Sequence, residues 1–219
     1  MNLLIINPNI SAATNARIRA IAEPLVSVDD VLEVVSADTG VELIETVDQS
    51  ASTVPAVLAM VTARHSEVDA IVIAAFSDPG LQEAQRIASC PVIGISEAAM
   101  KTAAKTADRF TIITLGSELG QAIKKNAHTY GVSDQLVDIN ILPWTVAQVS
   151  ADPKSHQNAF AEACQRAVTE DGVGAVIIGG GPLSGIADAI ADDLPVPVLD
   201  GVRCAVEMSL MSSQKQVPA

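Results

Sequence analysis

The sequence is poor in aromatic residues and in positive charge, and both shortages exclude classes of partner. Phe, Trp and Tyr make up only 2% of the 219 residues, so the chain is a poor candidate for a protein that stacks nucleic-acid bases on aromatic rings. The formal net charge is −13, and Lys and Arg form no cluster. A field of this sign repels phosphate backbones. We therefore expect no nucleic-acid partner.

Long apolar runs are also missing from the chain. The longest, residues 70–76, is much shorter than the roughly 20 residues that a membrane-spanning helix needs. No basic residues precede the N-terminal apolar run, which is therefore typical of a first strand and not of a signal peptide. We expect no membrane partner and a cytoplasmic location.

Cysteine and histidine occur only three times each, and neither shows the spacing of a metal site. Cys164 and Cys204 lie in predicted helices, and Cys90 precedes a proline at a predicted strand start, so we expect packing roles and reduced thiols. The glycine-rich residues 179–185 fit neither the dinucleotide fingerprint nor the P-loop. The sequence therefore predicts no metal and no cofactor.

What the chain does contain is a pattern that occurs twice. A β-branched run and its Pro/Gly turn, residues 68–80, recur 105 positions later at residues 173–185. Each run is apolar on both faces, which is typical of a central strand in a buried parallel sheet. Six elements recur in the same order at nearly constant spacing, which indicates a duplicated unit. The pairs are 3–9 and 110–116, 12–25 and 118–130, 31–35 and 136–141, 54–67 and 158–170, 68–80 and 173–185, and 91–95 and 197–201.

This duplication predicts an α/β fold with two pseudo-symmetric lobes, each a short parallel sheet flanked by helices. We expect lobe 1 to span residues 1–98 and lobe 2 to span residues 99–201. The C-terminal helix, at about residues 202–211, is expected to pack back on lobe 1, and residues 212–219 are expected to form a frayed tail.

The turn after each repeated strand is predicted to begin a helix. In the first copy Asp78 can serve as N-cap with Pro79 at the first helical position, and in the second copy Gly181 and Pro182 take those places. A helix N-terminus offers free N–H groups and the positive end of the helix dipole, so each turn can bind an anion. Two such turns suggest one site between two similar halves.

Ligands of open parallel sheets bind outside the carboxyl ends of the strands, so the turns there form the candidate site. Such a pocket suits a carboxylate or a planar imide. The candidate substrate-binding residues are Asn7, Asn9, Phe76, Ser77, Ser117, Gly180, Gly181 and Pro182. Each polar member also has a structural alternative: the two asparagines could be turn residues. Ser117, like Ser11, could be a helix cap.

Four segments in order carry a family resemblance. They are Asn7-Pro-Asn9 with Ser11, Phe76-x-Asp78-Pro-Gly-Leu81, Pro91-Val-Ile-Gly-Ile-x-Glu97-Ala-Ala-Met100 and Pro197-Val-Leu-Asp200-Gly-Val202. Together they resemble the hydantoin/allantoin racemase branch of the aspartate/glutamate racemase superfamily, over essentially the whole chain. The resemblance implies two α/β lobes with the active site in the cleft between them. It also implies cofactor-independent proton transfer at an acidic carbon, and a homo-oligomer.

In that family two cysteines face each other across the substrate, and the resemblance places them here at Ala75 and Gly180. The repeat gives the same registration, because these two positions are 105 residues apart. A thiolate can form near neutral pH and remove a proton, whereas alanine and glycine cannot. We therefore do not expect two-cysteine racemisation. Ser77, Asp78 or a bound water would have to act instead, although a helix N-terminus opposes the raised pKa that Asp78 would need as a base.

Several functions stay open at this point. The first is a cofactor-independent, isomerase-type enzyme of this superfamily acting on a small carboxylate, amino acid or hydantoin-like substrate. The second is a lyase or hydrolase with one general base, and the third is a non-catalytic binding protein. Ala75 could also be an engineered replacement of a cysteine. Gly180 is less easily explained in that way, because the Gly-Gly-Gly-Pro turn around it is self-consistent.

Overall fold

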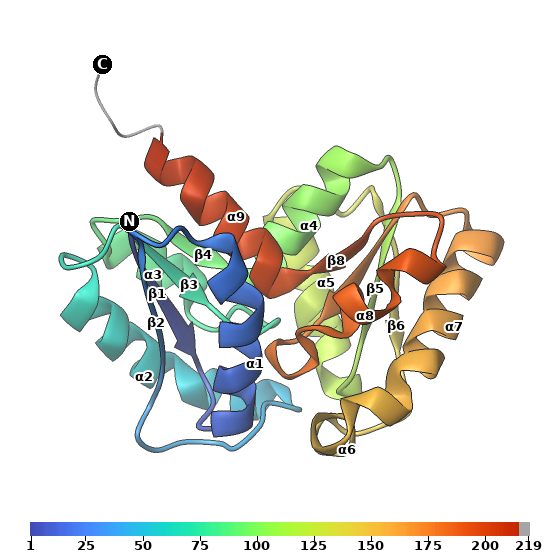
Figure 1. The fold of residues 1–219 in the computed structure, drawn as a ribbon. Helices are drawn as coiled ribbons and strands as arrows, with labels where there is room; N and C mark the ends of the chain where they lie inside the picture. The colour runs from blue at the N-terminus through green and yellow to red at the C-terminus, as the bar shows by residue number, and fades with distance from the viewer. Residues whose placement is uncertain (215–219) are drawn as a thin grey trace.

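The computed structural model describes residues 1–214, which form two parallel four-stranded sheets with helices packed against them (Figure 1). The strand orders are β2-β1-β3-β4 and β6-β5-β7-β8. The first sheet contains β1 (Asn2–Asn7), β2 (Val31–Ser36), β3 (Ala70–Ile73) and β4 (Val92–Gly94). The second contains β5 (Phe110–Thr114), β6 (Leu136–Ile141), β7 (Ala175–Gly179) and β8 (Val198–Asp200). The repeated order confirms the predicted fold class.

The helices follow corresponding strands in the two halves of the chain, which we call the first half (β1–α4) and the second half (β5–α9). The first half contains α1 (Ala12–Ala22), α2 (Val47–Arg64), α3 (Leu81–Ile87) and α4 (Ile95–Thr106). The second contains α5 (Gly120–Thr129), α6 (Val146–Ala151), α7 (Pro153–Asp171), α8 (Ile186–Ile190) and α9 (Gly201–Gln214). The extra helix α6 was not expected. It forms because Thr145 and Gln148 make a capping box at its start.

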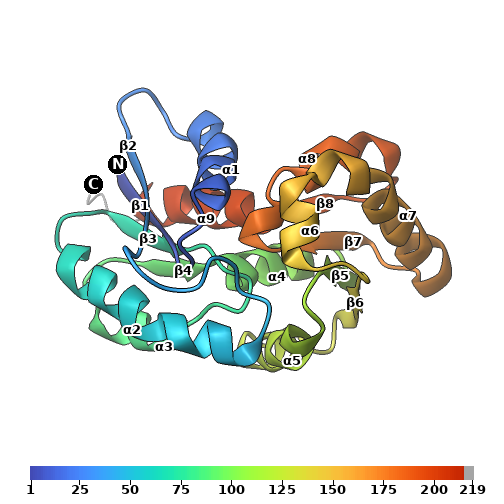
Figure 2. The ribbon, with the colours of Figure 1, turned by 90° about the horizontal axis from the view of Figure 1, so that it is seen from below.

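Both faces of the central strands are buried, as the continuous apolar runs predict. In β1, Leu4 and Ile6 pack with α2 and α3, whereas Leu3 and Ile5 join the core between the two sheets. This division follows from the alternation of side chains along a strand. Helices α7 and α8 cover the outer face of the second sheet, while α1, α4, α5 and α9 contribute to the layer between the sheets (Figure 2).

The two inner helices α4 and α9 are exchanged between the halves. Helix α4 follows β4 of the first sheet and packs against β7 of the second, while α9 follows β8 and packs against β3, β4 and α1 (Figure 1). The two helices also pack against each other. Their first residues meet, because a Cβ atom on Gly201 would lie only 3.0 Å from the carbonyl oxygen of Ile95. This exchange joins the two sheets through one shared core.

Several helix boundaries differ from the sequence prediction, and three have a clear structural outcome. Helix α2 begins at Val47 and not at residue 54, because Thr46 and Gln49 form a capping box there. Helix α7 begins at Pro153 and not at residue 158, because the Asp152 side chain accepts a hydrogen bond from the backbone N–H of Ser155. Helix α9 continues to Gln214, so the expected tail from residue 212 begins too early. The remaining residues of that tail, 215–219, lie outside the described part of the chain.

Candidate functional site

A small cavity lies between the two sheets, at the carboxyl ends of their strands. Its volume is about 40 Å³, room for about three water molecules. Both repeated turns, residues 74–77 and residues 179–183, contribute to its wall. The other lining residues are Asn9, Ile44, Thr114, Leu115, Leu119, Ile123 and Val146. The cavity therefore occupies the position expected for a ligand site in parallel sheets.

The structure brings most of the predicted binding residues together in this wall. Those that line the cavity are Asn9, Phe76, Ser77, Gly180, Gly181 and Pro182. Asn7 is fully buried but lies behind the wall, where its Nδ2 donates to Asn9 Oδ1 at 2.9 Å and to Asn15 Oδ1 at 2.8 Å. Ser117 is exposed and lies outside the cavity. It is not a cap either, since Gly116 takes the N-cap position of its 3-10 helix.

Hydrogen bonds from its neighbours hold the Asn9 side chain in place and leave its Nδ2 group without a partner among residues 1–214. Its Oδ1 accepts hydrogen bonds from Asn7 Nδ2 and from the backbone N–H of Ser11, both at 2.9 Å. Ser11 in turn caps α1, as the sequence suggested, by accepting from the N–H of Thr14. The hydrogen bonds of residues 1–214 leave Asn9 Nδ2 unused. A fixed amide donor therefore belongs to the cavity wall.

The glycines after β7 let the two halves approach closely. A Cβ atom on Gly179 would lie 2.7 Å from Cε1 of the Phe76 ring, and one on Gly181 would lie 2.6 Å from the carbonyl oxygen of Ala74. Any side chain at either position would push the turn after β7 away from the turn after β3. These two glycines therefore set the narrow width of the cavity.

Gly180 has a backbone conformation that excludes side chains. Its φ of 144° and ψ of 131° lie in a region that glycine alone adopts without strain. A Cβ atom there would also lie 3.3 Å from Leu183 Cγ. The glycine is thus dictated by the turn itself. Ala75, by contrast, lines the cavity and is not at positive φ.

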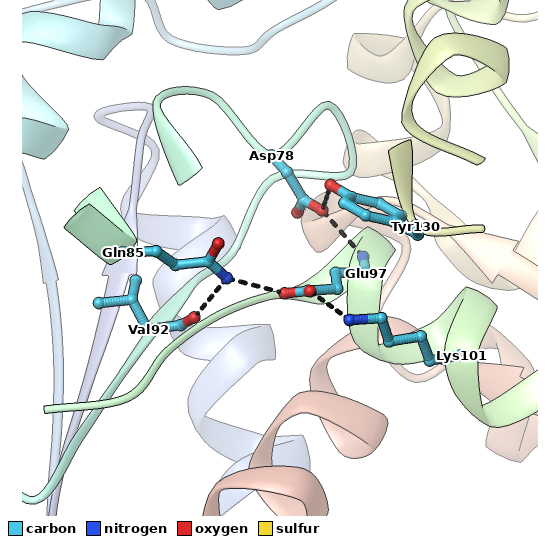
Figure 3. A network of polar contacts seen from close by, with 6 residues as sticks. All are labelled: Asp78, Gln85, Val92, Glu97, Lys101 and Tyr130. Atoms are coloured by element: carbon cyan, nitrogen blue, oxygen red, sulfur yellow. Dashed lines mark hydrogen bonds and ion pairs between the residues drawn. The ribbon is translucent and has the colours of Figure 1, made fainter. Parts of the chain in front are cut away.

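Asp78 caps a different helix from the one predicted. Its carboxyl group accepts a hydrogen bond from the backbone N–H of Ser96 at 3.2 Å, at the start of α4. It also accepts from the backbone N–H of Glu97 at 2.8 Å and from the Tyr130 hydroxyl at 2.6 Å (Figure 3). The N-cap of α3 is Gly80, which has φ 72° and no side-chain bond. The positive φ of Asp78 and Gly80 turns the chain, so the Asp78 side chain reaches α4 instead of the next helix.

Burial raises the pKa of Asp78 to about 7, because desolvation of the carboxylate outweighs the donors around it. This corrects the expectation that a helix N-terminus keeps the pKa low. The pKa of Tyr130 is raised as well, by burial and by the neighbouring carboxylate. Asp78 can therefore change its protonation near neutral pH, although its oxygens already accept three hydrogen bonds.

Ser77 is part of the wall but has no base to activate it. Its Oγ lies 2.7 Å from Ser50 Oγ, and its carbonyl oxygen accepts from Asn126 Nδ2 at 3.1 Å. A nucleophilic serine needs a histidine or another base within hydrogen-bond reach, and serine is a poor base. The geometry therefore gives Ser77 a role in hydrogen bonding and none in nucleophilic catalysis.

Among the described residues that line the cavity, none has a side chain that titrates near neutral pH: the lining includes no Asp, Glu, His, Cys, Lys, Arg or Tyr. Cys164 and Cys204 are buried elsewhere, and burial raises the pKa of each thiol to about 12. Within residues 1–214, His, Cys, Asp and Glu side chains nowhere gather in a group of three that could hold a metal ion. No described helix has the length and apolar character to span a membrane.

Among the residues around the cavity that the sequence analysis missed, three make hydrogen bonds there. Thr114 lines the wall and donates from Oγ1 to the carbonyl oxygen of Gly179 at 2.6 Å. Asn126 and Tyr130 reach the turn after β3 from α5 and its C-cap. The available signal was modest: Tyr130 is the single tyrosine of the chain, and Asn126 lies one helical turn before it.

Comparison with known proteins gives consistent relatives. The family model described as Asp/Glu/Hydantoin racemase matches residues 3–209. The chain is 30% identical to a hydantoin racemase of Pseudomonas sp. (strain NS671), over 95% of this chain and 84% of that one. It is 31% identical to a hydantoin racemase of Rhizobium meliloti, over 95% and 87%. It is also similar to the solved allantoin racemase from Klebsiella pneumoniae, with a TM-score of 0.91 and 34% identity over 96% and 86% of the two chains.

Proposed function

Because the chain belongs to the Asp/Glu/Hydantoin racemase family, we propose that it binds an uncharged, hydantoin-like cyclic amide in the cavity between its two sheets. The observation that carries this proposal is the chemistry of the wall. It offers hydrogen-bonding groups and apolar surface, and it lacks charged side chains altogether. A cyclic amide presents neutral N–H and C=O groups, which match such a wall.

Two side chains of the wall suit the two kinds of group on such a ring. Asn9 Nδ2 is a free donor for a ring carbonyl. The Thr114 hydroxyl donates a hydrogen bond to the carbonyl oxygen of Gly179. Its Oγ1 keeps lone pairs that can accept a hydrogen bond from a ring N–H. Because the cavity of about 40 Å³ is small, binding would also require side chains such as Leu119 and Leu183 to move outward.

The same wall speaks against a carboxylate substrate such as aspartate. A buried carboxylate needs a charged or strongly hydrogen-bonding partner. No Lys or Arg lines the cavity, and the formal net charge of the chain is −13. Backbone N–H groups would be the main groups left to compensate the buried negative charge. We therefore place the cyclic amide ahead of the amino acid.

Under this proposal the protein binds the cyclic amide but does not transfer protons with two thiols. The positions that the family resemblance gives to the two cysteines are Ala75 and Gly180, and both line the cavity without a titratable group. A second candidate is isomerisation with Asp78 as a single base, which its pKa of about 7 favours. For that reaction Asp78 would first have to release Tyr130 or the start of α4.

Calorimetric titration tests the proposal. Hydantoin, allantoin, aspartate and glutamate are added separately to the purified protein. We expect saturable binding of a cyclic amide and none of the two amino acids at the same concentration. Preferential binding of an amino acid would overturn the choice of ligand class. A homo-oligomeric assembly, which the family resemblance implies, and a cytoplasmic location, which the sequence pattern led us to expect, stay proposals. Sedimentation velocity tests the first.

A further inference from the structure

One helix of the second half holds the turn that forms the cavity wall of the first half. Asn126 Nδ2 donates to the carbonyl oxygen of Ser77 at 3.1 Å. The Tyr130 hydroxyl donates to Asp78 Oδ2 at 2.6 Å (Figure 3). The two donors are four residues apart, so they lie on one face of α5 and its C-cap. They contact adjacent residues of the turn.

The same part of the second half also lines the cavity. Ile123 of α5 and Leu119 just before it border the cavity together with Phe76 and Ser77 of the turn after β3. Helix α5 therefore both lines the cavity and hydrogen-bonds to the turn. A shift of the turn relative to α5 would change the width of the cavity directly.

The turn has separate anchors within its own half. Ser77 Oγ pairs with Ser50 Oγ of α2 at 2.7 Å, and the N–H of Asp78 donates to the carbonyl oxygen of Ala75 at 2.9 Å. The Asp78 carboxyl group also accepts from the start of α4. Loss of the two donors of α5 would therefore leave the turn folded and remove only its hydrogen bonds to α5, because Ala74 and Phe76 would keep their close approach to the glycines after β7.

We propose that Asn126 and Tyr130 are positioning residues: their hydrogen bonds to Ser77 and Asp78 hold the wall formed by Phe76 and Ser77 at the distance from α5 that the ligand requires. The effect on ligand affinity rests on the proposed function. The effect on the turn itself does not, and it can be measured without ligand.

The charged groups near this contact give it a dependence on pH. On α4, Glu97 pairs with Lys101 at 2.6 Å, and Lys101 Nζ lies 5.9 Å from the centre of the Tyr130 ring. From α3, Gln85 Nε2 donates to Glu97 at 3.2 Å (Figure 3). Asp78 is the group of this set whose pKa is raised to about 7. The Tyr130 hydroxyl lowers that pKa, so its removal should move the titration of Asp78 to higher pH.

The first test is hydrogen–deuterium exchange of the ligand-free protein, with Tyr130→Phe and Asn126→Ala compared with the wild type. Lys125→Ala is the control, because Lys125 is an exposed residue of the same helix. We expect peptides covering residues 75–81 to exchange faster in both variants, on the order of 5-fold, and unchanged in the control. Unchanged exchange in both variants would overturn the positioning role, whether or not the protein binds hydantoin.

The second test is the affinity for hydantoin between pH 5.5 and 8.5. Each variant should bind on the order of 3- to 10-fold more weakly, as expected for one lost hydrogen bond. The midpoint of the pH dependence should rise in Tyr130→Phe and stay in place in Asn126→Ala. Wild-type affinity and an unmoved midpoint in Tyr130→Phe would contradict the proposal. Absence of binding in the wild type would instead reject the proposed function, and the exchange experiment would then decide the positioning role alone.

Discussion

The carboxyl group of Asp78 occupies the space into which a side chain at Gly94 would project. In the second half, the position equivalent to Gly94 is Asp200, 106 residues later. Its carboxyl group accepts from the backbone N–H of Val202 at 2.8 Å and thereby caps α9. Both halves thus place a buried carboxyl group at the start of the exchanged inner helix. In the first half the carboxyl group belongs to Asp78, in the turn after β3. In the second half it belongs to Asp200, the last residue of β8.

The buried Asp78 predicts a stability that falls as pH rises. Its pKa is raised to about 7 in the folded protein, while an unfolded Asp titrates near 3.9. Between these values the folded state holds a proton that the unfolded state has lost, so the free energy of unfolding decreases from about pH 4 to about pH 7. Urea denaturation at several pH values measures this slope.

Substitution of Asp78 isolates its share of that slope. Asp78→Asn should destabilise the protein by about 1–3 kcal/mol, because an amide cannot accept from all three donors. It should also flatten the decline between pH 4 and pH 7. Asp200→Asn is the parallel variant: burial raises the pKa of Asp200 in the same direction, so this substitution should also flatten the decline. An identical slope in Asp78→Asn and the wild type would refute the raised pKa.

Gly180→Ala should cost about 2–3 kcal/mol of unfolding free energy, because the backbone at φ 144° is strained for any side chain. Gly172→Ala is the control: it has φ 65° with open space around its Cβ position, and should cost about 1–2 kcal/mol. Chemical denaturation compares the two. Ala75→Cys should fold well, because Ala75 is not at positive φ. Adding Gly180→Cys should destabilise the protein, because the backbone at Gly180 is strained for any side chain.

Gly181→Ala should force the two halves apart. The new Cβ atom would lie 2.6 Å from the carbonyl oxygen of Ala74, a backbone atom that no rotamer change can move. We expect a loss of more than about 2 kcal/mol and weaker ligand binding. Gly120→Ala offers the contrast, because its Cβ atom would meet only the tip of Ile141 at 3.0 Å. Equal melting temperatures for the two variants would argue against the close contact of the halves.

Thiol alkylation of the native protein should leave ligand binding intact. Cys164 and Cys204 are buried, and the pKa of each is raised to about 12, so iodoacetamide should modify them only after unfolding. Cys90 is partly exposed and should react slowly, because burial raises its pKa as well. Mass spectrometry locates the adducts. Loss of hydantoin binding after modification of Cys90 alone would show that a thiol matters to the site.

The duplicated pattern was sufficient to predict both sheets and the position of the cavity, because strand periodicity and turn residues are local signals. The partners of Asp78 were not predictable in this way. Its carboxyl group reaches Ser96 and Tyr130, which lie 18 and 52 residues away in the sequence. Such contacts depend on how α4 and α5 pack.

The two asparagines of the first turn show the same limit. Asn7 and Asn9 are two residues apart in one motif, yet only Asn9 lines the cavity. Asn7 is the last residue of β1 and hydrogen-bonds within its own half. Which of two neighbouring polar side chains faces a ligand depends on turn geometry that residue types alone do not specify. The lobe boundaries at residues 98 and 201 stay predictions.

The most direct test of the central claim is proton exchange at the ring carbon of a 5-substituted hydantoin in deuterated buffer, followed by NMR, in parallel with the melting temperature. The account predicts a raised melting temperature, by mass action of a bound ligand, and deuterium uptake no faster than in buffer alone. Uptake well above the buffer rate would contradict it. If that uptake survives thiol alkylation, the base is not a thiol, and Asp78, the residue next to Ser77 of the wall, is the first to examine.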